Sequence, residues 1–193
     1  MSSSAEPYGA RPVGTLSANG SYSGKVRHYS IASGYATSIF YGDFVKLVAA
    51  GGVEKDTGTT SLTPVGIFLG CSYTDPNTNQ LTFNQMWTAS IAASDAVAYV
   101  IDDPDVIFEM QADGTGAQTV IGNNVAVVQT AGSTTIGTSK NAVDISTVAA
   151  TTATLPIRIV DISSKSGNTA GDSYTDLVVK FNAGHIMRNT TGI

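Results

Sequence analysis

Hydrophobic and polar residues alternate in short runs along this chain, and Gly or Pro interrupts the runs at short intervals. Such alternation predicts half-buried β-strands, and a short uninterrupted apolar run predicts a buried one. Helical periodicity is limited to two short stretches, Ala89–Asp95 and Gln118–Ile121. We therefore expect strands over Lys25–Ile31, Ile39–Tyr41, Phe44–Val48, Val65–Cys71, Leu81–Phe83, Ala96–Ile101, Val106–Met110, Asn124–Gln129 (or a helix end here), Leu155–Ile162 and Leu177–Phe181.

This order of elements predicts an all-β fold. Many strands at short spacing, without alternating helices, are typical of a single β-barrel or β-sandwich domain with at most short helices. Gly42–Asp43 and Asp75–Asn77 are expected turns, the second of which leads into the return strand of a hairpin. The glycines of the 65–71 run indicate a close approach of another backbone. The Thr/Ser/Gly-rich stretches 129–140 and 146–154 are expected to be surface loops.

The first 24 residues have a different pattern. Prolines and glycines separate isolated apolar residues, among them Tyr8, Val13, Leu16 and Tyr22. We expect an extended N-terminal arm over 1–24, whose anchors contact a neighbouring surface, and a β-rich body over 25–193. A frayed terminus is the alternative interpretation.

Composition narrows the classes of partner. Charged residues make up 13% of the chain, against about 25% in typical globular domains, while 42% is hydrophobic. Ser, Thr, Asn and Gly fill the polar positions, and such a surface is cheap to desolvate against a partner. The net charge of −5 and the scattering of the 10 basic residues argue against nucleic acid as a partner.

The chain shows no sign of secretion or membrane insertion. Its N-terminus lacks the basic and apolar regions of a signal peptide, and no apolar run approaches the ~20 residues that span a bilayer. Cys71 is a single thiol, so no intrachain disulfide can form. We expect a protein that folds in a reducing cytoplasm, without a membrane partner.

Candidate catalytic groups are few. Asp102, Asp103, Asp105 and Glu109 form an acidic cluster that suits a glycoside hydrolase or a Ca²⁺ site. The cluster lacks the alternating ligands and the glycine of a calcium loop, and Pro104 within it favours a solvated turn. The turn is the interpretation that we prefer.

Nucleophilic and metal sites are also not indicated. His28 and His185 lie near opposite ends of the chain, no G-x-S-x-G elbow is present, and Cys71 lies in an apolar strand. One cysteine and two distant histidines do not form a recognisable zinc site. We expect no catalytic residue, metal or cofactor.

Trp87 is the remaining aromatic candidate. It follows the predicted hairpin and is expected near Tyr73. An exposed Trp at this position suits an interface anchor or a platform for sugar binding. A core Trp that closes one end of a barrel is the alternative, and it is the interpretation that the pattern favours.

Several segments, in order along nearly the whole chain, resemble the capsid decoration (cement) proteins of tailed bacteriophages from marine and cyanobacterial hosts. No single segment is specific. The segments are Tyr8–Val13, Gly42–Leu47, Pro64–Tyr73, Ala98–Asp105, Phe108–Asp113 and Leu155–Val160.

The resemblance implies a non-enzymatic virion protein, made in the host bacterial cytoplasm, that binds the outer surface of the capsid and links neighbouring major capsid proteins. It also implies self-association, usually as a homotrimer at local threefold positions, with a dimer at twofold positions as the other arrangement. We expect capsid or subunit contacts at Tyr8, Arg11, Pro12, Val13 and Trp87, and edge strands as a further contact mode. A phage tail or fibre component, or a carbohydrate-binding β module, is the alternative.

Overall fold

The computed structural model describes residues 4–16, 25–182, 184–190 and 192–193. Within these ranges it is nearly all β, as predicted, and no helix has the length and hydropathy needed to cross a membrane. Two single turns of 3₁₀ helix, Gln118–Val120 and Ile186–Arg188, are present. The strands are β1 (Arg11–Thr15), β2 (Arg27–Ser30), β3 (Phe44–Leu47), β4 (Val53–Lys55), β5 (Gly66–Thr74), β6 (Leu81–Asn84), β7 (Val97–Ile101), β8 (Val106–Gln111), β9 (Asn124–Val128), β10 (Ala142–Ala149), β11 (Ile157–Ile162) and β12 (Asp176–Phe181).

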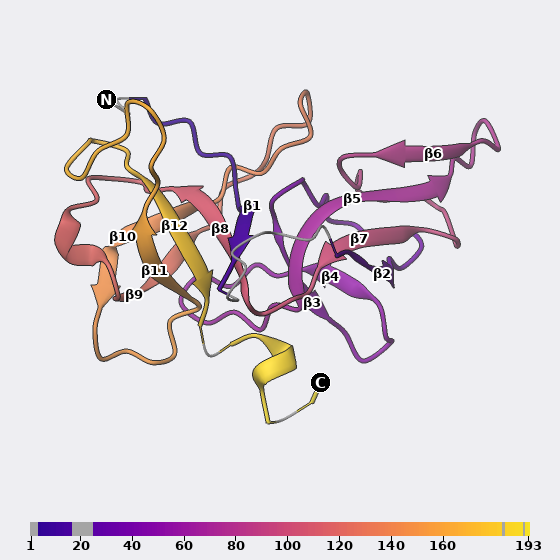
Figure 1. Cartoon of the computed structure of the whole chain (residues 1–193). Helices are drawn as coiled ribbons and strands as arrows, with labels where there is room; N and C mark the ends of the chain where they lie inside the picture. The colour runs from indigo at the N-terminus through magenta and orange to yellow at the C-terminus, as the bar shows by residue number, and fades with distance from the viewer. Residues whose placement is uncertain (1–3, 17–24, 183, 191) are drawn as a thin grey trace.

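The first sheet contains β1, β8, β12, β11, β9 and β10 in that order, and its neighbouring strands are antiparallel. It lies on the left in Figure 1. A parallel bridge between Ala112 and Val143 brings the end of β8 next to β10. The sheet therefore curls back on itself and approaches a closed barrel.

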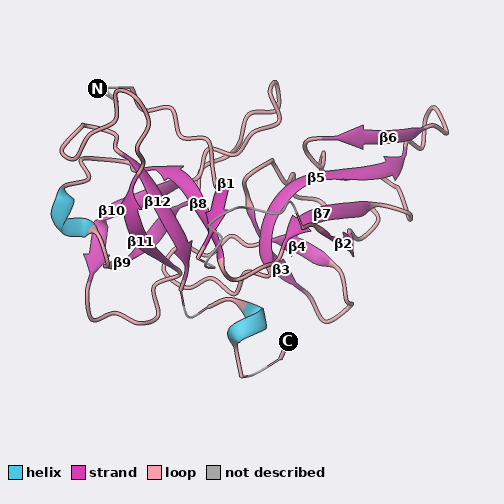
Figure 2. Ribbon diagram, in the orientation of Figure 1, coloured by secondary structure: helices cyan, strands magenta, loops and turns pink. Residues whose placement is uncertain are grey.

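The second sheet is built around the nine-residue strand β5. Strand β7 pairs with one edge of β5 and carries β2 on its far side. On the other edge, β3 pairs with the start of β5 and β6 pairs with its end. Strand β4 continues the sheet beyond β3. Figure 2 shows that β6 is the outermost strand of the projecting end of this sheet.

Both sheets contribute to one hydrophobic core. Its members include Ile159 and Phe181 of the first sheet together with Phe44, Ile67 and Ile101 of the second. The Phe181 ring makes an edge-to-face contact with Phe44, at a centroid distance of 6.0 Å. A second cluster, which contains Phe68, Trp87 and Val100, lies within the second sheet and its connections.

Two glycines of β5 confirm the close approach that the sequence predicts. A Cβ on Gly66 would lie 1.9 Å from the carbonyl oxygen of Ile101 on β7. A Cβ on Gly70 would lie 2.8 Å from the carbonyl oxygen of Asn84 on β6. These oxygens are backbone atoms, so they can move aside only if the strand that carries them shifts. Strand β5 therefore needs glycine at the two positions where β7 and β6 come this close.

The structure differs from the predicted elements in several places. Residues 39–41 contribute isolated bridges rather than a strand, and 89–95 form turns rather than a helix. Strands β1, β4 and β10 were not predicted, and β10 occupies half of the stretch 146–154 that was assigned to a loop. Strands β1 and β4 are short, and β10 interrupts its apolar residues with Asp144, Ser146 and Thr147, so their strand structure depends on neighbours that the local pattern does not contain.

Candidate functional site

The N-terminal segment packs against the body of its own chain. The amide of Gly9 donates to the carbonyl of Asn141 at 3.2 Å, and that of Ala10 donates to the carbonyl of Gly42 at 3.0 Å. Ala10 is 0% exposed and belongs to the main core, and the following residues form β1 against β8. Residues 4–15 of the predicted arm therefore pack on the body of their own chain. Residues 1–3 and 17–24 of the predicted arm lie outside the described residues.

A glycine allows this close packing. Gly9 has a φ of +73°, and a Cβ at this position would lie 2.5 Å from the Cβ of Ser139. Only glycine adopts this conformation without strain and leaves room for the neighbouring segment. The position of residues 4–15 therefore depends on Gly9, which directly follows the predicted contact residue Tyr8.

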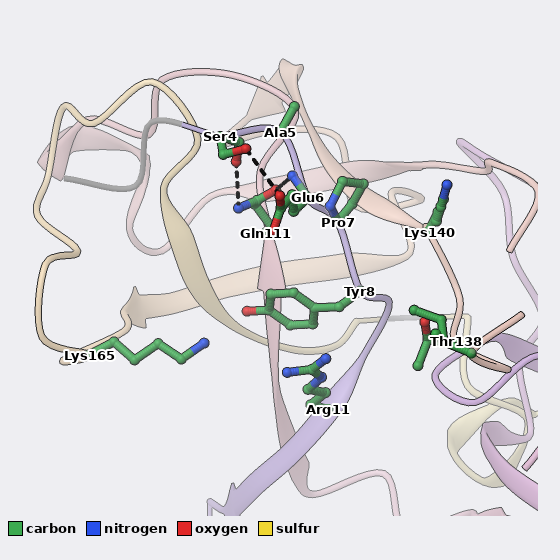
Figure 3. Close-up of a pocket in the computed structure, with 11 residues that line it drawn as sticks. Ser4, Ala5, Glu6, Pro7, Tyr8, Arg11, Gln111, Thr138, Lys140 and Lys165 are labelled. Atoms are coloured by element: carbon green, nitrogen blue, oxygen red, sulfur yellow. Dashed lines mark hydrogen bonds between the residues drawn. The ribbon is translucent and has the colours of Figure 1, made fainter. Parts of the chain in front are cut away.

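The Tyr8 ring lies next to two cations, Arg11 and Lys165 (Figure 3). The Arg11 guanidinium lies 4.1 Å from the centre of the Tyr8 ring, and the Lys165 ammonium lies 5.0 Å from it. The Tyr8 hydroxyl donates a hydrogen bond of 2.8 Å to Oδ1 of Asp176 on β12. Burial, reinforced by the carboxylates of Asp176 and Glu109, raises the pKa of Tyr8 far above its ordinary value. Tyr8 is therefore a neutral donor at physiological pH.

The charges around Tyr8 are matched in sign. The Lys165 ammonium lies 3.0 Å from Oε2 of Glu109 and 3.7 Å from Oδ2 of Asp176, two buried carboxylates. The hydroxyl of Ser163 also donates to Glu109. Arg11 adds a second cation beside the ring, so two cations face two carboxylates. These ion pairs hold the N-terminal segment against β8 and β12, beside a hollow of about 700 Å³.

The predicted contact residues of the N-terminal segment differ in exposure. Tyr8 and Pro12 are half-buried, whereas Arg11 and Val13 are exposed. Pro12 and Val13 lie where the pairing of β1 with β8 shifts register. Arg11 and Val13 are thus available at the surface, and their contact with a capsid stays a prediction.

Trp87 is fully buried, at 0% exposure. Its indole Nε1 donates to the carbonyl of Tyr35 at 3.2 Å, and its ring contacts Tyr73 edge-to-face at 5.6 Å. This placement corrects the expectation of an interface anchor, because the side chain is enclosed by its own chain. It also removes the aromatic platform on which the carbohydrate-binding alternative depended.

A buried ion pair lies where the N-terminal segment meets the body. Asp43, which is fully buried, lies 2.8 Å from the ammonium of Lys55 on β4. Its carboxylate also accepts hydrogen bonds from the amide of Phe40, the hydroxyl of Ser139 and the side chain of Asn141. Residues 139–141 lead into β10 of the first sheet, so this cluster connects both sheets. The segments around Tyr8 and Asp43, both part of the resemblance, meet here.

The acidic cluster is divided between separate structural contacts. Asp102 is buried and pairs with Arg27 at 2.8 Å, and the hydroxyl of Tyr29 donates to it at 2.9 Å. Asp105 pairs with Arg188, whereas Glu109 belongs to the Tyr8 site. In the described ranges no group of three or more His, Cys, Asp and Glu residues forms a possible metal site.

The other candidate chemical groups are buried in different surroundings. Cys71 packs in the second cluster, and burial raises the pKa of its thiol to about 12. His185 is fully buried against Phe181, and burial lowers its pKa to about 4. His28 lies on β2, where its ring makes an edge contact with Tyr99. The structure thus places the thiol and the two imidazoles in separate contacts.

The exposed edge of β6 is a site that was predicted only as the return strand of a hairpin. Leu81 and Phe83 alternate along the strand, and they are 62% and 70% exposed. Both side chains project to the same face, because successive strand residues point to opposite sides. The signal in the sequence is the pattern Leu-Thr-Phe-Asn inside a stretch without charge, from Pro76 to Ser94.

Comparisons with known proteins give no match, whether to a family model, to a curated protein or to a solved structure.

Proposed function

We propose that this chain is a structural assembly protein that binds the outer surface of a bacteriophage capsid and links neighbouring major capsid proteins. The observation that carries the proposal is the free edge of β6, where two large apolar side chains and an uncharged strand are presented to solvent. An exposed strand edge with alternating apolar side chains is suited to bind other chains. The ordered series of segments that resembles cement proteins supports the capsid as the partner.

The mechanism would be thermodynamic linkage. A protein that binds the assembled lattice, and not its free subunits, stabilises that lattice by the free energy of binding. Repetition over a shell adds multivalency, so each contact needs only modest affinity. A surface poor in charge suits this function, because few ionic groups must be desolvated at each contact.

The N-terminal segment supplies a second contact region. Arg11 and Val13 are exposed on β1, at the opposite end of the first sheet from β10. The Tyr8 site holds them in place with matched charges, so they would meet a partner without a large cost in conformational entropy. If copies associate with each other through β6, the β1 contacts of the associated copies would join neighbouring capsid proteins.

Electron microscopy of purified virions that contain this protein tests the proposal. We expect copies at the symmetry axes of the head lattice, on its outer surface. Copies confined to the tail would contradict the proposal and support the alternative of a tail or fibre component. Absence from the particle would contradict both.

A further inference from the structure

Edge strands of β-sheets usually carry a feature that prevents pairing with another chain, such as a charge, a proline or a bulge. Four edge strands of this protein follow the rule. Strand β1 has Pro12 and a register shift, and β10 has Asp144 and a register shift. Strand β2 has Arg27, and β4 has Glu54. Strand β6 differs, since Leu81–Asn84 has no charge, no proline and no register shift in its pairing with β5.

The pairing with β5 determines which backbone groups of β6 face outward. The amide of Asp75 donates to the carbonyl of Gln80 at 2.9 Å, so these two residues are a hydrogen-bonded pair at the start of the ladder. In an antiparallel ladder such pairs alternate with non-hydrogen-bonded ones. Thr82, opposite Tyr73, therefore bonds to β5. Leu81 and Phe83 direct their amides and carbonyls to the free edge.

An independent contact agrees with this alternation. Thr74 lies opposite Leu81, and its amide donates to the carboxylate of Asp95 at 3.1 Å instead of bonding to β6. A residue in a non-hydrogen-bonded pair directs its amide away from its partner, as Thr74 does. Leu81 is the other member of this pair, so its amide and carbonyl point away from β5, towards the free edge of β6.

We infer that β6 pairs with β6 of a second copy of this chain, antiparallel, about a twofold axis at Thr82. Leu81 then lies opposite Phe83 of the second copy, and Phe83 lies opposite its Leu81. Because both residues direct their backbone groups outward, each of these pairs exchanges two hydrogen bonds, which makes four in total. The two sheets join into one sheet that continues across the axis.

The side chains fit this register. Leu81 and Phe83 of both copies gather on one face of the joined sheet, which removes the most exposed apolar groups of β6 from water. The two Thr82 residues face each other on the opposite side. No charged residue lies between Asp75 and Asp95, so the contact brings no like charges together. A register that pairs Leu81 with itself would place Phe83 opposite Asn79, whose φ of 55° is outside the strand region.

This inference rests on the proposed function in one respect, since it assigns the β6 edge to self-association and leaves β1 of each copy as the contact with the capsid. It can be tested without a capsid, by sedimentation of the purified chain over a range of concentrations. We expect a reversible dimer with twice the mass of 19.9 kDa. A wild-type chain that stays monomeric at every concentration would overturn the inference.

A pair of double variants tests the register. Leu81→Lys with Phe83→Lys places like charges opposite each other, whereas Leu81→Lys with Phe83→Glu places opposite charges there. Both variants lose the same two apolar side chains. We expect the Lys/Lys variant to associate roughly tenfold more weakly than the Lys/Glu variant at low salt, because cross-strand charges act on the residue directly opposite. Equal association would overturn the register, and circular dichroism checks that both variants fold.

A cysteine placed on the twofold axis gives a second measurement. In the inferred pair the Thr82 Cα atoms are about 4.5 Å apart, within the range that a disulfide spans. Thr82→Cys should therefore form a disulfide-linked dimer on mild oxidation. Gln80→Cys is the control, since two copies of residue 80 lie about 13 Å apart in this register. The native thiol of Cys71 is buried. Equal cross-linking of both variants would contradict the geometry.

The two proposals fail separately. A monomeric wild-type chain found on virion heads would overturn the β6 pairing and leave the proposed function intact. A dimer with the expected cross-link, found in a protein that is absent from the virion, would support the pairing and overturn the proposed function.

Discussion

The side chain of Asp43 illustrates how single residues hold this fold together. Burying a carboxylate away from water costs folding free energy unless the carboxylate is paired with a cation and hydrogen-bonded. Asp43 satisfies both conditions, with Lys55 as its ion pair and three further donors, the nearby Phe40 and the distant Ser139 and Asn141. The cluster is thus a junction between the turn before β3, strand β4 and the segment that enters β10.

We predict that Asp43→Asn destabilises the protein by about 3–5 kcal/mol, because it leaves the ammonium of Lys55 buried without its counter-charge. Urea unfolding followed by circular dichroism measures the change. Asp105→Asn is the matched control. Asp105 pairs with Arg188 at the exposed surface, where an ion pair contributes only about 0–1 kcal/mol. Equal losses in the two variants would contradict the role of burial.

His185 predicts a dependence of stability on pH. Burial lowers its pKa to about 4 in the folded state, below the ordinary value of 6.5. Between these values the unfolded chain binds more protons, so the free energy of unfolding decreases as pH falls from 6.5 towards 4. The contribution is fully present above pH 6.5, and its loss is at most about 3 kcal/mol. Urea unfolding at pH 7 and pH 4.5 measures it.

The control for this pH dependence is His185→Asn. The Nδ1 atom of His185 accepts from the amide of Met187 at 3.2 Å, as the cap of a helical turn. Asparagine also caps helix starts and does not titrate. The variant should therefore keep the fold and lose the part of the slope between pH 6.5 and 4 that belongs to the imidazole. An unchanged slope would show that other groups cause it.

At the scale of elements, β1 shows how a short strand is positioned by residues before it. Its first residue follows Gly9 and Ala10, whose amides bond to residues 141 and 42. Gly9 has a φ of +73°, and a Cβ there would collide with Ser139. Gly34 has nearly the same φ, +74°, with no atom within 4 Å of an added Cβ. Substitutions at these two positions therefore allow the cost of backbone strain to be measured apart from the cost of a steric collision.

We predict that Gly34→Ala costs about 1–2 kcal/mol, which is the strain of the left-handed conformation alone. Gly9→Ala should cost about 1–3 kcal/mol more, because the added methyl group overpacks the junction with Ser139. It should also speed amide exchange in β1, since residues 4–15 lose their anchor. Amide exchange followed by mass spectrometry, together with urea unfolding, measures both effects. Equal costs would contradict the steric account.

The same segment explains why the N-terminal region could not be predicted fully. Its prolines and glycines are typical of an extended chain, and residues 5–10 form neither helix nor strand. What decides its position is the complementary surface, which includes Gly42, Ser139 and Asp176. These residues are far away in sequence, and no local pattern links them to Tyr8. The strands with strong alternation or apolar runs, such as β5 and β12, were predicted because their own residues determine their burial.

The candidate contact residues show a similar limit. Trp87 and Phe83 are both large aromatics near the hairpin, and the sequence offered Trp87, not Phe83, as a candidate contact residue, with a core position as the favoured alternative. The structure buries Trp87 under Tyr73 and exposes Phe83. Which face of β6 meets solvent depends on the pairing with β5, where a shift of one residue exchanges the faces. That register is fixed by the hairpin turn, whose exact pairing the sequence did not reveal.

At the scale of the whole molecule, the shared core links two sheets that appear separate in Figure 1. Phe44 and Ile67 of the second sheet belong to the same cluster as Ile159 and Val179 of the first. The Asp43 cluster adds polar contacts across the same junction. Such an arrangement should unfold as one cooperative unit, because residues of both sheets form the shared core and the loss of either sheet exposes it.

Fluorescence of Trp87, the single tryptophan, reports on the second cluster, and this allows a test of cooperativity between the sheets. Ile159→Ala creates a cavity in the first sheet and should cost about 2–5 kcal/mol. If the sheets unfold together, the urea midpoint of Trp87 fluorescence falls by the same amount as that of circular dichroism. Ile136→Ala, at a residue that is 64% exposed, should move neither. A fluorescence midpoint that stays unchanged in Ile159→Ala would mean that the second sheet is stable alone, and the shared core would then contribute little to holding the two sheets together.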